Sequence, residues 1–177
     1  MVTIHFHQKG SHMEKERLKF CIERFDHYYD STNNKSAVFL AIGTFVLGGL
    51  IAAYPYISDN VPCSIWVYGT YYTSAALAVT TLIVVILAAT PYLTQSNESA
   101  YYYGSIASKS KEEFSIESGS FDAVKDLTDL RDQVHGLANG LKRKFKLLYL
   151  AGRLYLLMFI SIAAFTIALL INLKTNL

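Results

Sequence analysis

Three long apolar stretches interrupt an otherwise polar chain. They cover residues 36–57, 73–93 and 154–173, and none of them contains Asp, Glu, Lys or Arg. A helix rises about 1.5 Å per residue, so about 20 apolar residues are needed to cross the hydrocarbon core of a bilayer. A buried core helix of a soluble protein fits poorly with three stretches of this length. The pattern predicts three transmembrane helices.

The polar segments carry apolar side chains at helical spacing. One stripe precedes the first apolar stretch, and a second precedes the third. Their members recur every three or four residues: Leu18, Cys21, Ile22, Phe25 and Tyr29 in the first, and Leu127, Leu130, Val134, Leu137 and Leu141 in the second. The stripes predict an all-α protein in which an N-terminal amphipathic helix packs on a long, coiled-coil-like helix that leads into the third span.

Two local patterns refine this expectation. Residues 30–34 favour caps and turns, so the N-terminal helix either breaks before Ser36 or runs on into the first span. Ser110 followed by Glu113 matches a capping box and predicts a short helix near residues 111–116.

The positive charges are distributed unevenly around the spans. Lys and Arg gather in residues 13–35 and 94–153, whereas residues 58–72 have neither. Because cytoplasmic segments retain Lys and Arg, we expect the first two segments to be cytoplasmic. The N-terminus should then lie inside the cell and the C-terminus outside. Residues 58–72 are read as the outer connection, and Pro55 and Pro91 as markers of span ends. Cys21 and Cys63 then lie on opposite sides and cannot form a disulfide.

Four glycines are predicted helix-packing positions. Gly43 and Gly48 give the first span a small-residue face that another helix can approach closely, in the same chain or in a second copy. We therefore expect a homo-oligomer. Gly136 and Gly140 cost about 1 kcal/mol each relative to alanine in a helix, and close packing is the expected reason for them.

Composition narrows the classes of function. The 177 residues suit one domain, and 52% hydrophobic residues are too many for disorder. Residues 1–12 are expected to be a disordered tail or a cloning remnant, which leaves 13–177 as the domain. The chain has no nucleophile elbow, phosphate loop, zinc cluster or dinucleotide fingerprint, so no enzyme, metal site or cofactor is predicted. The scarcity of ionisable groups in the spans disfavours a transporter.

Several short sequence motifs follow one another along the chain. They are Arg24-Phe25-Asp26 with Tyr28 and Tyr29, Asn34-Lys35-Ser36, Tyr103 to Ala107, Ser110 to Phe114, Asp129-Leu130, Gln133 to Ala138, and Lys144-Phe145. In this order they resemble the motifs of the Pycsar transmembrane effectors, which are bacterial antiphage proteins paired with a pyrimidine cyclase. The resemblance covers most of residues 14–173. The departures are mild: Ser36 stands for Ala, Tyr103 for Phe, and Phe114 and Phe145 for Tyr.

The resemblance implies an abortive-infection effector in the bacterial inner membrane. Such an effector senses cyclic CMP or cyclic UMP made by the cyclase and impairs the membrane, and no nucleic acid polymer is expected as a partner. A cyclic nucleotide is an anion with a flat base, so its site needs cations and aromatic faces. The candidate ligand residues are Arg24, Asn34, Lys35, Tyr103, Phe114 and Arg131.

Two other functions stay open at this point. One is a constitutive membrane scaffold or lipid-binding subunit. The other is a small channel subunit with another trigger.

Overall fold

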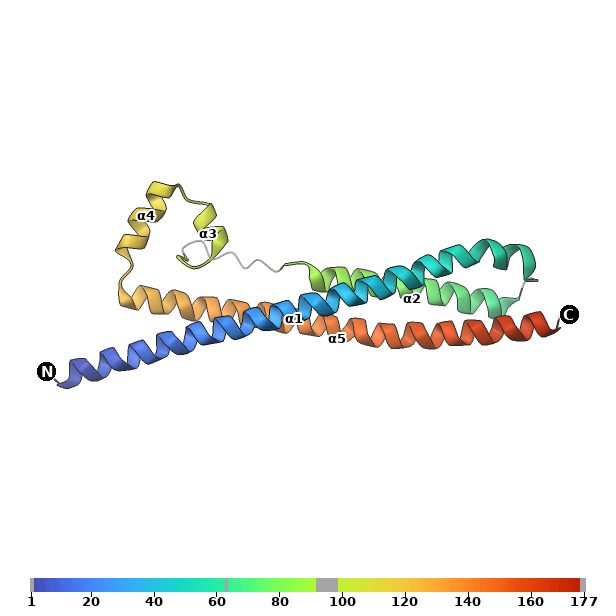
Figure 1. Ribbon diagram of the computed structural model, residues 1–177, viewed down its shortest axis with the longest axis horizontal. Coiled ribbons are helices and arrows are strands. Elements are labelled where there is room, and N and C mark those ends of the chain that lie inside the picture. The colour runs from blue at the N-terminus through green and yellow to red at the C-terminus, as the bar shows by residue number, and fades with distance from the viewer. Residues whose placement is uncertain (1, 63, 92–98, 176–177) are drawn as a thin grey trace. The chain divides into compact units, whose positions relative to one another are not determined.

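The computed structural model describes residues 2–62, 64–91 and 99–175, and the side chains of residues 1–11 lie outside the described part. Within it the chain forms α1 (Val2–Asn60), α2 (Ile65–Ala89), α3 (Tyr103–Ala107), α4 (Lys111–Ser120) and α5 (Ala123–Thr175) (Figure 1). No strand occurs among these residues. The predicted all-α class is confirmed.

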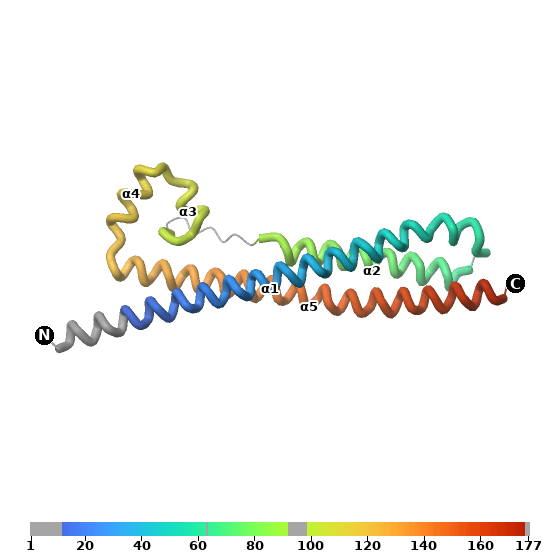
Figure 2. The backbone as a smooth tube through the Cα atoms, in the orientation of Figure 1, coloured from blue at the N-terminus to red at the C-terminus, as the bar shows by residue number. Residues whose placement is uncertain are grey.

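The chain divides into two units. We call Met1–Ser31 with Pro91–Lys142 the polar unit, and Thr32–Thr90 with Arg143–Leu177 the spanning unit. α1 and α5, which Figure 2 shows as two long continuous helices, each contribute a segment to both units. α2 belongs to the spanning unit, and α3 and α4 belong to the polar unit.

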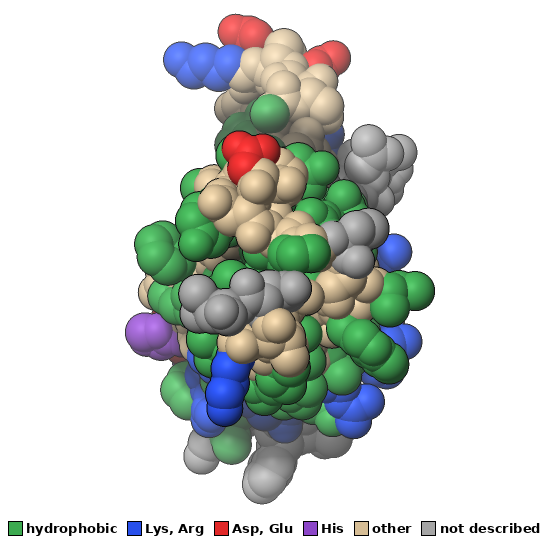
Figure 3. All heavy atoms as spheres, turned by 90° about the vertical axis from the view of Figure 1, so that its right-hand side faces the viewer, with side chains coloured by type: hydrophobic (Ala, Val, Ile, Leu, Met, Phe, Trp, Pro, Cys, Tyr) green, Lys and Arg blue, Asp and Glu red, His purple; other side chains and the backbone are tan. Residues whose placement is uncertain are grey.

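The spanning unit confirms the three predicted membrane helices. α1, α2 and α5 are each long and apolar enough to cross a membrane. The side chains between them include Leu50 of α1, Val67 and Val85 of α2, and Tyr155 and Met158 of α5. Many larger apolar side chains are exposed, and the end view in Figure 3 shows hydrophobic side chains at the surface among other types. An exposed apolar surface of this kind suits contact with lipid.

Hydroxyl groups join the three helices inside the spanning unit. Tyr71 of α2 donates to the Leu50 carbonyl of α1 at 2.9 Å, and Tyr155 of α5 donates to the Phe39 carbonyl of α1. The hydroxyls of Ser74 and Ser161 connect α2 to α5 at 2.8 Å. Such bonds hold helices together where the surroundings give no hydrophobic driving force.

The glycines of the first span differ in their surroundings. A Cβ atom at Gly43 would lie 2.6 Å from the Tyr155 hydroxyl and 2.7 Å from a methyl carbon of Leu82. Gly43 therefore allows close packing within the chain. A Cβ atom at Gly48 would have no described heavy atom within 4 Å. On this face Gly43 has a partner within the chain, and the described residues provide none for Gly48.

The ends of two spans differ from the prediction. α1 continues through Pro55 to Asn60, so the reading of Pro55 as an end marker is wrong. A proline inside a helix removes one backbone bond, which a span end tolerates better than the bilayer centre does. α2 begins at Ile65, whereas the predicted span began at Thr73. The aromatic residues at the start of α2 are therefore helical and do not belong to the outer connection.

The other end of α2 follows the proline rule. It closes at Ala89, and Thr90 is extended with a ψ of 132° directly before Pro91. A residue before proline avoids the helical region, so Pro91 ends the helix as predicted. The predicted span ended at Leu93, which lies outside the described residues.

The open question at residues 30–34 is answered by a continuous helix. α1 runs through this segment without a break. Ser36 donates to the carbonyl of Thr32 at 2.9 Å, and both side chains are buried. A polar side chain that bonds back to the preceding turn is satisfied inside the helix and does not need to end it. The backbone of residues 2–12 belongs to the same helix, and the division into a tail and a domain from Met13 stays a prediction.

Candidate functional site

The polar unit is held by an apolar contact between α1 and α5. Leu18 of α1 packs with Leu127 and Leu130 of α5, and Ile22 and Val134 extend the cluster by one turn. These residues belong to the two stripes recognised in the sequence. Their spacing places them on one face of each helix, so the contact is continuous along the pair.

Two ion pairs flank this apolar contact. Arg131 donates from Nε and from a terminal guanidinium nitrogen to the two oxygens of Glu14, each at 2.9 Å. This paired hydrogen bond holds the pKa of Glu14 below its ordinary value. Lys15 donates to Asp126, which also accepts from the Tyr101 hydroxyl. The bond to Asp126 raises the pKa of Tyr101 to about 12.

The pKa of Asp126 is lowered, although burial alone would raise it. Burial raises its pKa, but the hydrogen bonds from Lys15 and Tyr101 outweigh burial and leave the pKa below the ordinary value. The carboxylate is therefore ionised at neutral pH and stays paired with Lys15.

A buried network fixes the chain that leads into α3. Asp129, 9% exposed, accepts from the backbone N–H of Ala100 at 2.8 Å. The Ser99 hydroxyl accepts from the N–H groups of Tyr101 and Tyr102 at 3.1 and 3.0 Å. Gln133 donates to the same hydroxyl at 2.9 Å. We call Ser99, Asp129 and Gln133 with these amides the turn network.

From the sequence, Asp129 and Gln133 have no predicted role beyond their place in the family-like motifs. Their spacing of four residues places both on one face of α5, and this was the available signal. Their partners could not be found in the same way, because Ser99 and Ala100 lie far away in the chain and carry no distinctive pattern.

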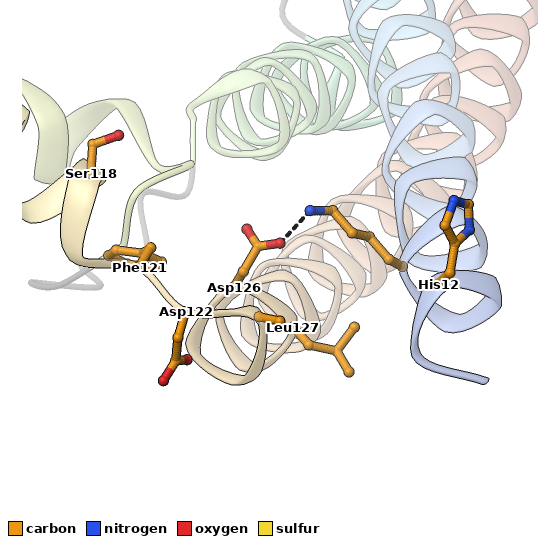
Figure 4. A pocket seen from close by; sticks show the side chains of 8 residues that line it. His12, Ser118, Phe121, Asp122, Asp126 and Leu127 are labelled. Carbon is orange, nitrogen blue, oxygen red and sulfur yellow. Dashed lines mark hydrogen bonds and ion pairs between the residues drawn. The ribbon is translucent and has the colours of Figure 1, made fainter. Parts of the chain in front are cut away.

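A cavity of about 560 Å³ lies where α1, the end of α4 and the start of α5 meet. Lys15 donates to Asp126 there, and Figure 4 shows Asp126 among the lining residues together with Phe121 and Leu127. The volume suits a small molecule. Its lining is His12, Lys15, Ser118, Phe121, Asp122, Ala123, Asp126 and Leu127, none of them a predicted ligand residue.

Arg24 combines a cation with aromatic faces. It is exposed on α1, and its guanidinium carbon lies 5.8 Å from the ring centroids of both Phe20 and Tyr28. The guanidinium also donates to the Tyr28 hydroxyl at 2.8 Å. These distances are typical of cation–π contacts. The aromatic partners are residues one turn away on the same helix, not the predicted Tyr103 and Phe114.

The other predicted ligand residues lie on several elements. Arg131 is engaged with Glu14, Tyr103 is exposed with its ring centroid 5.1 Å from that of Tyr102, and Phe114 is half-buried on α4. Asn34 and Lys35 are exposed residues of α1 in the spanning unit, whereas the other four candidates belong to the polar unit. The six residues stay predicted ligand residues.

The glycines of α5 also differ from each other. A Cβ atom at Gly140 would overlap the hydroxyl of Tyr29, which donates to the Leu137 carbonyl at 3.0 Å. The close packing expected at Gly140 is therefore present. At Gly136 no described heavy atom lies within 4 Å of such a Cβ, so the packing expected there is not found.

Cys21 is a free, half-buried thiol. Cys63 lies outside the described residues, so the expectation of no disulfide stays a prediction. The described residues contain no group of three or more His, Cys, Asp or Glu side chains that could hold a metal ion.

Three helices that are long and apolar enough to cross a membrane, together with a helical polar unit, define the class of integral membrane proteins. A family model described as Pycsar effector protein domain matches residues 17–172, and the chain belongs to this family. The resemblance indicated by the short sequence motifs is confirmed. Membership in this family implies an antiphage effector with a membrane context and a cyclic nucleotide signal. It also suggests that the effector is not an enzyme. Comparison with curated proteins and with solved structures gave no match.

We predict that Asp129→Ala releases the turn network. The N–H of Ala100 would lose its acceptor, and an unpaired buried group costs about 1–3 kcal/mol. Hydrogen exchange should therefore become roughly ten- to a hundredfold faster at the amides of Ala100, Tyr101 and Tyr102. Asp132→Ala, an exposed change on the same helix, is the matched control. Unchanged exchange at these amides in Asp129→Ala would refute the role assigned to Asp129.

Proposed function

We propose that this effector senses cyclic CMP or cyclic UMP through its polar unit on the cytoplasmic side and then impairs the inner membrane, which gives abortive infection. The observation that carries the proposal is the family match, which runs through the polar unit and all three apolar helices. A pyrimidine cyclase would supply the nucleotide. The effector itself needs no catalytic group, because damage follows from a change in the spanning helices.

Arg24 is the strongest candidate for the phosphate of the nucleotide. Its guanidinium is exposed and held between aromatic rings, so a phosphodiester and a base could both find partners there. Arg131 would have to leave Glu14 first. Asn34 and Lys35 are exposed and remain candidates, as do Tyr103 and Phe114 for the base.

The cavity is a weaker candidate for the phosphate. Lys15 is its cation, but Asp122 and Asp126 also line it, and Lys15 already binds Asp126. Two carboxylates repel an anion more than one shared ammonium attracts it. Phe121 could still stack on a base, so the cavity suits the base better than the phosphate.

The signal has a continuous path through the backbone. A ligand shifts an equilibrium only if it binds one arrangement of the helices better than another. α1 and α5 are continuous helices that belong to both units. A change in their packing in the polar unit can therefore bias the spanning unit. We propose that self-association through the Gly48 face completes the lesion.

For orientation, we predict that Cys63 faces outward and Cys21 inward. A membrane-impermeant maleimide applied to intact spheroplasts should label Cys63 and spare Cys21 until the cells are opened. A Cys63→Ser variant should abolish labelling of sealed cells. Labelling of Cys21 alone in sealed cells would reverse the orientation.

For assembly, we predict that Gly48→Leu reduces cross-linked oligomers in lipid and leaves the thermal midpoint of the monomer unchanged, because a Cβ atom at this position would have no described heavy atom within 4 Å. Gly43→Leu is the matched control: it overfills the contact with Tyr155 and Leu82 and should destabilise the bundle by about 1–3 kcal/mol. If cross-linking finds only monomers, with and without nucleotide, assembly is not part of the mechanism.

For sensing, we predict that cyclic CMP or cyclic UMP causes dye release from proteoliposomes, and that cyclic AMP does not. Arg24→Ala should raise the half-maximal nucleotide concentration roughly ten- to a hundredfold, as expected for one charge-assisted hydrogen bond. Arg17→Ala, another exposed arginine of α1, is the matched control at equal protein incorporation. Lys35→Ala tests the candidate in the spanning unit.

The rival functions give different results in the same assay. Equal leakage with and without every nucleotide would contradict ligand gating. Selective lipid binding with no nucleotide response would favour a scaffold, and continuous ion conduction would favour a channel subunit.

A further inference from the structure

Lys144 is a charged side chain buried in the spanning unit. It lies on α5 before the apolar stretch 154–173 and is only 3% exposed. Its ammonium donates to the side-chain oxygen of Asn33 at 3.1 Å and to the carbonyl of Ala89 at 3.3 Å. One group on α5 therefore contacts α1 and α2 at once.

The contact with Ala89 caps a helix end. Ala89 is the last residue of α2, and the final carbonyls of a helix have no partner within it. Thr90 satisfies the Ile86 carbonyl through its N–H and its hydroxyl, at 3.0 and 2.9 Å. Lys144 satisfies the Ala89 carbonyl from another helix. A cation also suits the negative end of the helix dipole.

Packing alone does not explain a lysine at this position. Burial lowers the pKa of the Lys144 ammonium, because the charged form loses its contact with water. An apolar side chain of similar length would fill the same space without this cost. Lys142 and Lys146 on the same helix are exposed, so cations of this segment are not generally buried.

We propose that Lys144 is a latch that holds the end of α2 against α1 and α5 in the resting state, and that releasing it accompanies membrane damage. If α5 turns or slides, the ammonium leaves Asn33 and Ala89 together. Its flexible stem then lets the charge reach water or lipid headgroups. The Ala89 carbonyl loses its cap in the same step. The first part of the proposal concerns the fold, and only the link to damage rests on the proposed function.

The latch is tested by a distance measurement in liposomes without nucleotide. Spin labels at Ile86→Cys on α2 and Lys146→Cys on α5 are introduced after Cys21→Ser and Cys63→Ser. With Lys144 present we expect one narrow distance distribution. Lys144→Met should broaden this distribution. The population of a second distance should rise roughly tenfold relative to the first, as expected for the loss of charge-assisted hydrogen bonds. Lys142→Met is the exposed control and should match the parent.

The thermal midpoint separates a latch from a purely structural role. Lys144→Met should change the midpoint little, because removal of a buried charge offsets the loss of the bonds to Asn33 and Ala89. A distance distribution equal to that of the parent would overturn the proposal. Broadening together with a midpoint far below that of the parent would also overturn it, since Lys144 would then be needed for stability alone.

Dye release tests the link to damage. Proteoliposomes that contain Lys144→Met should release dye without nucleotide, and their half-maximal nucleotide concentration should be about tenfold lower than that of the parent. If nucleotide opens the parent and Lys144→Met behaves like the parent, the link to damage fails. If no nucleotide opens the parent, the proposed function fails instead, and the distance measurement still decides whether the latch exists.

Discussion

A peptide group in lipid has no water to bond with, and this constraint shapes most of the spanning unit. It favours uninterrupted helices and makes each polar side chain find a partner nearby. Thr81 and Thr166 bond back to carbonyls four residues earlier, at 2.6 and 2.9 Å. The same constraint explains why a helix that ends near the membrane needs a donor from elsewhere. Lys144 meets that need at the end of α2.

The polar unit follows different rules, because water competes for every charge. Its ion pairs lie partly exposed, where such pairs contribute little stability. The lowered pKa values of Glu14 and Asp126 mean that their contribution is present above the ordinary carboxylate pKa of about 4 and is lost as pH falls through the lower folded values. These pairs are therefore insensitive to pH in the neutral range, so a trigger that rearranges them has to compete for their charges directly.

Hydropathy predicted the three spans because their apolar runs are long and free of charge, and the helical stripes predicted the residues that join α1 to α5. The span ends were harder. Trp66 and Tyr68 occur at interfaces and in helices alike, so the start of α2 could not be read from them. For the candidate site, the sequence indicated which residue types to expect but not their partners. The sequence alone does not show whether Arg131 binds a ligand or forms an ion pair with Glu14. The cavity depends on where the ends of α4 and α5 meet α1, which no local pattern reports.

The turn network bears on what the family-like motifs of this chain report. Asp129 and Gln133 belong to the short sequence motifs that resemble those of the family. In this chain Asp129 binds the backbone N–H of Ala100, and Gln133 binds the hydroxyl of Ser99, both in the segment before α3. A signature maintained by the fold places few demands on the ligand. In this chain these motifs therefore report on the turn and not on the nucleotide. Recognition of the family and knowledge of its signal are then separate pieces of information, and the second has to be sought on surfaces such as the one around Arg24.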